Sequence, residues 1–178
     1  SQSLGFSRIL RAVLRQDPDI IMLGEIRDLE TAQIAVQAAQ TGHLVLASIH
    51  TNSAVQTFIR LVNIGIPIYN LVDSLRMIIA QRLLRKLCTV CRKSQANIFV
   101  ASHGCRYCNN GYSGRQAIFE VMPISLEIKL YLQDKDFTVA NLEKMACQQG
   151  MQSLKTAGMA EIVVGNTSYK ELQRVCEI

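Results

Sequence analysis

Residues 20–25 read Ile-Ile-Met-Leu-Gly-Glu, a short apolar run that ends in a glycine and an acid. Residues 44–49 read Leu-Val-Leu-Ala-Ser-Ile, a second apolar run that lies between two histidines. Such continuous runs predict strands with both faces buried, as in parallel sheets. Between them, Asp28 can cap a helix that Gly42 would end. Strand, helix and strand within about thirty residues predict a right-handed βαβ unit, and therefore an α/β fold.

Beyond the second strand the sequence predicts helices, followed by a segment without regular periodicity. Asn52 or Ser53 is placed to cap a helix that ends at Gly65. One long amphipathic stretch follows over residues 68–87. Residues 88–114 are rich in cysteine and glycine and break the periodicity, so we expect a separate module there.

The remainder of the chain predicts one more strand and a helical tail. Residues 117–121 resemble a short strand, and residues 125–178 read as several short helices. Ser168 and Glu171 would form a capping box at the start of the last helix. The predicted organisation therefore has three parts, an α/β core, a cysteine module and a helical subdomain, over residues 1–87, 88–121 and 122–178.

The composition is that of a globular protein, with 49% apolar and 19% charged residues among 178. No apolar run reaches the roughly 18 residues that cross a bilayer, and the sequence shows no secretion signal pattern, so we expect a soluble, unexported protein. The net charge of +5 is concentrated in the middle of the chain. A basic middle suits phosphates, nucleic acid, an acidic membrane surface or a negatively charged metal centre equally well.

Four of the six cysteines give the strongest purely chemical pattern, two C-x2-C pairs formed by Cys88, Cys91, Cys105 and Cys108. Each pair can present two thiolates from one tight turn, and tetrahedral Zn²⁺ binds four thiolates at about 2.3 Å. We therefore predict a structural zinc site, with two disulfides or four free thiols as the alternatives. Neighbouring basic side chains would offset its negative charge, namely Arg85, Lys86, Arg92, Lys93 and Arg106.

The other two cysteines, Cys147 and Cys176, fall in helical surroundings. Free cysteine behaves as a small apolar side chain and is among the residues most often buried. We expect both to be buried rather than reactive.

Glu25 stands at the end of a buried strand, which is the Walker B position of nucleotide hydrolases. A carboxylate there can hold the hydration shell of Mg²⁺ or orient the attacking water, although a plain strand terminus has the same pattern. His43 and His50 flank the second strand. A histidine at its exit can sense a γ-phosphate, and the alternative is a histidine bonded to backbone.

In combination, these residues resemble the type II secretion and type IV pilus assembly ATPases. The resemblance is carried by Asp17-Pro18-Asp19, by residues 24–32 (Gly-Glu-Ile-Arg-Asp-Leu-Glu-Thr-Ala) and by residues 42–52, in this order, and is contiguous over residues 5–65. It implies that Glu25 is the catalytic Walker B acid, with Arg27 beside it in the sequence, and that the two histidines form the His box. It also places three arginines at the nucleotide and the subunit boundary, where ordinary surface charge is the alternative: Arg11, Arg15 and Arg60.

The resemblance implies a fold and a function. The fold is the C-terminal half of a RecA-like P-loop ATPase core, with an inserted tetracysteine zinc module and a helical C-terminal subdomain. The function is that of an ATP-hydrolysing motor for pseudopilin or pilin assembly, using ATP, Mg²⁺ and Zn²⁺. It implies a cytoplasmic homo-hexamer, peripheral at the inner membrane and working with an inner-membrane platform protein. The cysteine module favours the assembly and secretion branch over the pilus-retraction branch.

One expected element is absent, since the 178 residues contain no G-x4-G-K-[ST] phosphate-binding loop. We therefore expect a fragment of a longer protein that is inactive as an ATPase on its own, with a catalytically inactive remnant as an alternative. A zinc-ribbon module that binds nucleic acid is the rival from another class. Aromatic residues are only 6% and form no stacking platform, so no nucleic-acid partner is expected.

Overall fold

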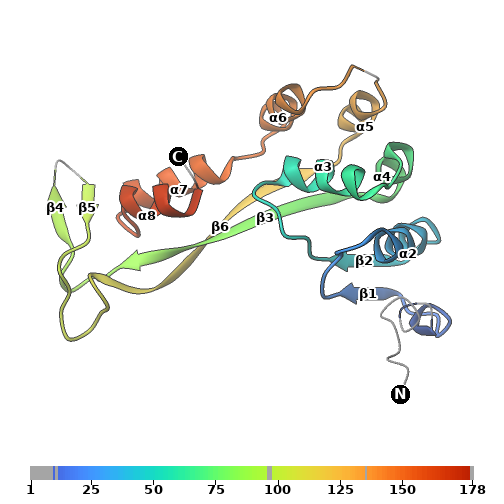
Figure 1. Ribbon diagram of the computed structural model, residues 1–178. Coiled ribbons are helices and arrows are strands. Elements are labelled where there is room, and N and C mark those ends of the chain that lie inside the picture. Colours follow the sequence, from blue (N-terminus) through green and yellow to red (C-terminus); the bar gives the residue numbers. More distant parts are fainter. Residues whose placement is uncertain (1–9, 11, 96–97, 135, 177–178) are drawn as a thin grey trace. The chain divides into compact units, whose positions relative to one another are not determined.

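The computed structural model describes residues 10, 12–95, 98–134 and 136–176, which form two compact units. The first unit consists of Ser1–Ile78 and Met122–Ala146, and the second of Ile79–Val121 and Cys147–Ile178. The chain thus alternates between the units, leaving the first after Ile78, returning to it at Met122 and leaving it again after Ala146. The order of the elements along the chain can be followed in Figure 1. The three-part division into residues 1–87, 88–121 and 122–178 stays a prediction.

The first unit contains the predicted βαβ motif, formed by β1 (Ile20–Leu23), α2 (Leu29–Gln40) and β2 (Leu44–Ala47). The two strands pair in parallel along their whole length, which confirms the prediction. The Asp28 carboxylate accepts a hydrogen bond from the Thr31 amide at 2.8 Å and so caps α2. That bond also lowers the pKa of Asp28, because it favours the charged carboxylate.

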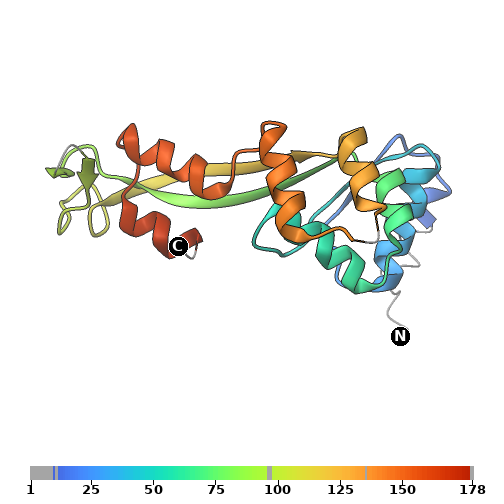
Figure 2. The ribbon, with the colours of Figure 1, turned by 90° about the horizontal axis from the view of Figure 1, so that it is seen from above.

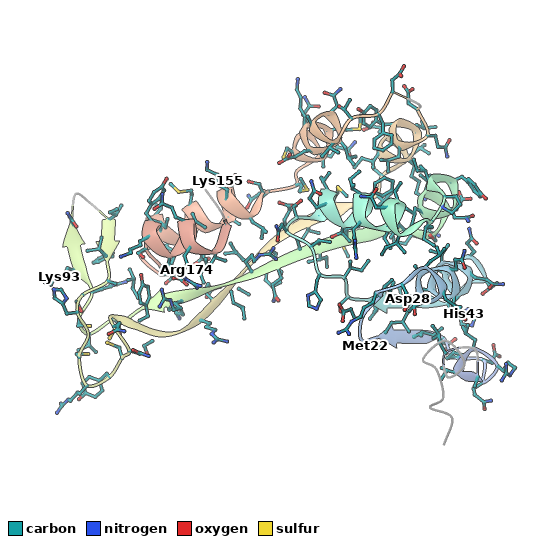
Figure 3. All side chains as sticks on the ribbon, in the orientation of Figure 1. Met22, Asp28, His43, Lys93, Lys155 and Arg174 are labelled. Carbon is teal, nitrogen blue, oxygen red and sulfur yellow. The ribbon has the colours of Figure 1, made fainter. Side chains whose placement is uncertain are left out.

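The expectation that both faces of these strands are buried is wrong for this structure. Ile21 and Leu23 are buried, whereas Met22, labelled in Figure 3, is 82% exposed. On β2, Leu44 and Leu46 are about half exposed as well. β1 therefore has one covered face and one apolar face open to solvent, whereas no residue of β2 is buried.

The first unit also contains the helices α3 (Ala54–Ile64), α4 (Ile68–Ser74), α5 (Leu126–Leu132) and most of α6 (Val139–Gln148). Ser53 caps α3 by accepting from the Gln56 amide at 3.2 Å, and Gly65 ends it in the left-handed conformation, as predicted. The Phe58 side chain is fully buried and meets the ring of Phe137 edge to face at 6.3 Å between centroids. Such aromatic packing stabilises a small helical core beyond the area it buries.

The stretch over residues 68–87, expected to be continuous, divides into α4 and a strand, β3 (Met77–Leu87). Buried and exposed residues alternate along most of β3, which is the period of a strand rather than of a helix. β3 is paired with β6 (Tyr112–Pro123), and the two run side by side in Figure 2. β6 includes the predicted strand at residues 117–121 but is longer. A small antiparallel pair, β4 (Lys93–Gln95) and β5 (Ile98–Val100), lies between them in the sequence.

The second unit also contains the last two helices, α7 (Leu154–Val163) and α8 (Tyr169–Cys176), so the helical tail is confirmed. α7 begins at a double cap, since Ser153 accepts from the Thr156 amide and the buried Glu120 carboxylate accepts from the Leu154 amide, both at 3.2 Å. No helix among the described residues is both long and apolar enough to cross a membrane.

The expectation that both remaining cysteines are buried is wrong for Cys147, which is exposed. Cys176 is half-buried, and burial raises the pKa of its thiol. Helical surroundings in the sequence therefore did not distinguish the two side chains.

Candidate functional site

The exits of β1 and β2 are joined by backbone and hydroxyl hydrogen bonds. The Ile26 amide donates to the Ser48 carbonyl at 2.9 Å, and the Ser48 hydroxyl donates to the Gly24 carbonyl. These bonds bracket Glu25 on both sides, so its backbone is held at the carboxyl end of a parallel pair. Ligand sites of open α/β sheets lie at such strand ends. Ser48 was not among the site residues predicted from the sequence, although its position directly after the apolar run of residues 44–47 could have indicated a hydroxyl at the strand end.

The Glu25 carboxylate is the centre of this site. Its Oε2 accepts a hydrogen bond from Arg27 Nε at 2.5 Å, and its Oε1 lies 3.3 Å from His50 Nε2. The Glu25 side chain is 20% exposed, whereas those of Arg27 and His50 are 78% and 88% exposed. The structure thus brings three of the predicted site residues together. The Glu25 carboxylate is largely buried, and the side chains of Arg27 and His50 are open to solvent.

The other predicted residues of this site lie elsewhere. His43 precedes β2, at the opposite end of the strand from His50, and its Nδ1 lies 3.0 Å from the Ala38 carbonyl and 3.1 Å from the Thr41 hydroxyl (Figure 3). Arg15 and Arg60 are exposed, and among the described residues neither forms an ion pair with Glu25. Arg11 lies outside the described residues. The functional roles of these residues stay predictions.

In the second unit, the four predicted cysteine ligands form one cluster, with all sulfur atoms within 4.8 Å of one another. The Sγ atoms are separated by 3.8 Å for Cys88 and Cys105, 3.6 Å for Cys91 and Cys108, and 3.7 Å for Cys105 and Cys108. A tetrahedron with metal–sulfur bonds of about 2.3 Å has sulfur–sulfur edges of about 3.8 Å. A disulfide would require about 2.05 Å. The donor set therefore fits one tetrahedral thiophilic ion such as Zn²⁺.

Backbone turns hold the sulfur atoms in place. The Arg92 amide donates to the Cys88 carbonyl at 2.9 Å, and the Cys108 amide donates to the Cys105 carbonyl at 3.1 Å, so each pair closes its own tight turn. Gly111 packs against the loop between the pairs, where a Cβ would lie 2.6 Å from the Ser102 carbonyl oxygen. Only glycine fits there, because the space is taken up by backbone.

Hydrogen bonds, burial and neighbouring thiols act on the ionisation of the clustered cysteines. A backbone hydrogen bond from Val90 helps to lower the pKa of Cys88 to about 7. A hydrogen bond from Ser102 favours the Cys91 thiolate, but burial and the neighbouring thiols outweigh it and raise the pKa of Cys91 to about 12. A divalent ion overrides these effects, since a coordinating thiol is deprotonated outright.

Several of the basic residues expected to neutralise this cluster have other partners. Arg92 donates from Nη1 to the Gly165 carbonyl at 2.7 Å and lies over the Phe99 ring at 4.0 Å. Arg106 lies over Tyr107. Arg85 lies over the Tyr112 ring at 4.2 Å and binds a carboxylate from the end of the chain. These contacts join the cysteine segment to α7 and α8.

The carboxylate is that of Glu171, whose side chain is fully buried. Ser168 accepts from the Glu171 amide at 3.3 Å, which confirms half of the predicted capping box. The Glu171 side chain, however, binds the guanidinium groups of Arg85 and Arg174, at distances down to 2.6 Å. Burial alone would raise the pKa of Glu171, but hydrogen bonds from Arg174 and Arg85 outweigh it and lower the pKa to about 2.

Comparison with known sequences finds one family over almost the whole chain, since residues 1–174 match the family described as type II/IV secretion system protein. The type IV pilus assembly ATPase PilB of Pseudomonas aeruginosa is 42% identical over 192 residues, which cover 98% of this chain and 34% of PilB. The type II secretion system protein HxcR of the same organism is 49% identical over 171 residues, which cover 96% of this chain and 36% of HxcR. The chain therefore spans about a third of the length of these relatives.

Solved structures give the same fold. The pilus retraction motor PilT with bound ADP aligns with a TM-score of 0.72 at 28% identity, covering 98% of this chain and 44% of PilT. The Legionella pneumophila ATPase DotB aligns with a TM-score of 0.73 at 22% identity, covering 96% of this chain and 42% of DotB. At that lower identity the likeness to DotB concerns the fold alone.

Proposed function

Because this chain belongs to the type II/IV secretion system protein family, we propose that it forms the part of an assembly motor ATPase that carries the Walker B acid and the zinc module. The motor would convert ATP hydrolysis into pseudopilin or pilin assembly. The observation that carries the proposal is the grouping of Glu25, Arg27 and His50 at the carboxyl end of the β1–β2 pair. A strand terminus without function would not require two nitrogen side chains on one acid.

We infer the following roles at that site. Glu25 would accept a proton or hydrogen bond from the attacking water, or hold the hydration shell of nucleotide-bound Mg²⁺, which supplies charge neutralisation on the phosphates. Arg27 and His50 are both exposed, each beside a different oxygen of Glu25, and would respond to a γ-phosphate by leaving Glu25 for the phosphate oxygens. His43 would help to fix the position of β2 against α2, because its Nδ1 contacts the Ala38 carbonyl of that helix.

The test is Glu25→Gln in the full-length protein, which would supply the phosphate-binding loop. We expect turnover to fall by at least about a hundredfold while ATP affinity changes little, because the carboxylate acts in the transition state rather than on ground-state binding. Glu143→Gln removes the same charge from the exposed surface of α6 and is the matched control. Near-normal kcat for Glu25→Gln, measured by phosphate release, would exclude this role.

We further propose that Cys88, Cys91, Cys105 and Cys108 hold one structural Zn²⁺. The tetrahedral spacing of the sulfur atoms supports a metal. The ion would fix the segment between β3 and β6 by cross-linking two tight turns, and its binding free energy would be folding free energy for that segment. No catalytic role is proposed, since four protein ligands leave no open position.

Assembly, partners and location remain part of the proposal. The full-length motor would be a homo-hexamer at the cytoplasmic face of the inner membrane, acting on a membrane platform protein, as the family resemblance implies. The 178 residues alone would show negligible ATPase activity, because their sequence contains no G-x4-G-K-[ST] phosphate-binding loop. Hydrolysis by the isolated chain at a rate close to that of the full-length protein would refute this.

A further inference from the structure

A small cavity in the second unit lies beside the tight turn that follows the last cysteine ligand. Its volume is about 240 Å³, and it is lined by Arg85, Asn109, Asn110, Tyr112, Gly114 and Arg115. Pockets for drug-sized ligands occupy about 300–1,000 Å³, so this one suits a small group. Two arginines and two asparagines are among the lining residues, and the side chains of both residue types can donate hydrogen bonds, which indicates a ligand that accepts them.

The charge of the surrounding segment is strongly positive. Residues 79–121 contain seven arginines and lysines and a single acid, Glu120. Glu120 is buried and accepts a hydrogen bond from the first turn of α7, so it is not placed to neutralise the surface. Even with the charge of a tetrathiolate zinc centre, the segment keeps an excess of positive charge.

One of the two arginines is held in place before any ligand arrives. Arg85 uses Nε and Nη2 to bind the buried Glu171 carboxylate, and its guanidinium lies over the Tyr112 ring. The Tyr112 hydroxyl is in turn bonded to Ser168 at 2.8 Å. Among the described residues, Arg85 Nη1 has no hydrogen-bond partner and remains a donor. Such a fixed donor loses little side-chain entropy when it binds an anion.

The second arginine is not one of the partners of the buried Glu171 carboxylate, which are Arg85 and Arg174. Arg115 is exposed on β6, and within the described part of the chain it forms no ion pair. Asn110 also lines the cavity, from a left-handed backbone conformation with a φ of 48°, which a short polar side chain tolerates.

We propose that this cavity binds a phosphate group. A phosphate offers three acceptor oxygens and up to two negative charges, which suits a cavity lined by two arginines and two asparagines better than the two oxygens of a carboxylate do. The group would come either from a phosphate compound in solution or from the headgroup of an anionic lipid. The site is independent of Glu25, since it lies in the unit that contains the cysteine cluster.

The experiment uses the zinc-loaded full chain and two probes, inorganic phosphate followed by nuclear magnetic resonance, and vesicles of phosphatidylcholine with or without phosphatidic acid. Arg115→Gln should weaken binding of the effective probe by about tenfold or more, because the variant loses a hydrogen bond between two charged groups. Asn110→Gly keeps the left-handed backbone, removes the amide, and should weaken binding severalfold.

Lys93→Gln is the matched control, because Lys93 is exposed in the same basic segment but does not line the cavity (Figure 3). It should change binding by less than about twofold, as a screened surface charge does. Binding of inorganic phosphate that depends on Arg115 assigns the ligand to solution, and binding of phosphatidic acid vesicles alone assigns it to a lipid. Equal losses for Arg115→Gln and Lys93→Gln, or no binding of either probe, would overturn the proposal.

Discussion

The buried Glu171 carboxylate of α8, which pairs with Arg85 and Arg174, gives the sharpest quantitative prediction. Its pKa is lowered from 4.5 to about 2, which corresponds to about 3 kcal/mol of stabilisation at neutral pH. The side chains of Arg85 and Arg174 are 44% and 56% exposed, however, so water screens part of the attraction. We therefore expect the charge of Glu171 to contribute about 1–2 kcal/mol.

The perturbation is Glu171→Gln, which keeps the shape and removes the charge. Because the pKa of Glu171 in the folded state lies below its ordinary value, the contribution is complete above about pH 4.5 and is lost as the pH falls toward 2. The difference in stability between the wild-type chain and the variant should thus be about 1–2 kcal/mol at pH 7 and should approach zero near pH 2. Comparing the two proteins at each pH cancels the effect of zinc loss, which both undergo in acid.

The assay is hydrogen exchange of the α8 amides, corrected for the intrinsic dependence of exchange on pH. Glu161→Gln is the control, since that carboxylate accepts a hydrogen bond from the neutral amide of Asn166 at 2.7 Å. It should alter α8 stability by less than about 1 kcal/mol. Unchanged protection of the α8 amides in Glu171→Gln at pH 7 would refute this role of the Glu171 charge. So would a loss of α8 stability that is the same at pH 7 and at pH 3.

Two further predictions concern the cysteine cluster and the contact between α7 and α8. Cys105→Ser should reduce bound zinc well below one equivalent, as measured by metal analysis. Hydrogen exchange should show that it lowers the stability of residues 88–120 far more than that of the first unit. A full equivalent of zinc in the variant would contradict the ligand assignment. Gly158→Ala should destabilise the second unit by about 1–2 kcal/mol in urea titrations, because a Cβ would lie 2.2 Å from the buried Leu172 side chain. Leu172→Ala combined with Gly158→Ala should relieve the clash, and strict additivity of the two losses would count against it.

Local features of the fold could be read from the sequence because their causes are local. Asp28 and Ser53 cap helices through amides three residues on, and Gly65 ends a helix because its backbone is left-handed. The four cysteines come together because two tight turns each fix a pair of sulfur atoms. The same holds for Glu25 and Arg27, which are two residues apart, while His50 joins them because parallel strands end at one edge.

Other features depend on neighbours that a local pattern does not reveal. Residues 68–87 are amphipathic throughout, yet the chain changes from helical to extended at Leu75, the residue that ends α4. Periodicity alone leaves short apolar stretches ambiguous between helix and strand. His43 and His50 look equivalent in the sequence, but a strand separates them, and only one approaches the acid.

The pairing of Arg85 shows why charge near a motif is a poor guide to its partner. Arg85 precedes the first cysteine ligand by three residues, so proximity in the sequence favours the thiolate cluster. In the structure it binds Glu171, which is 86 residues away. A fully buried carboxylate must be compensated by direct hydrogen bonds, whereas an exposed arginine beside a metal centre gains little from solvent-screened attraction. The larger energetic requirement therefore decides the contact, and it also fixes the guanidinium that lines the proposed phosphate pocket.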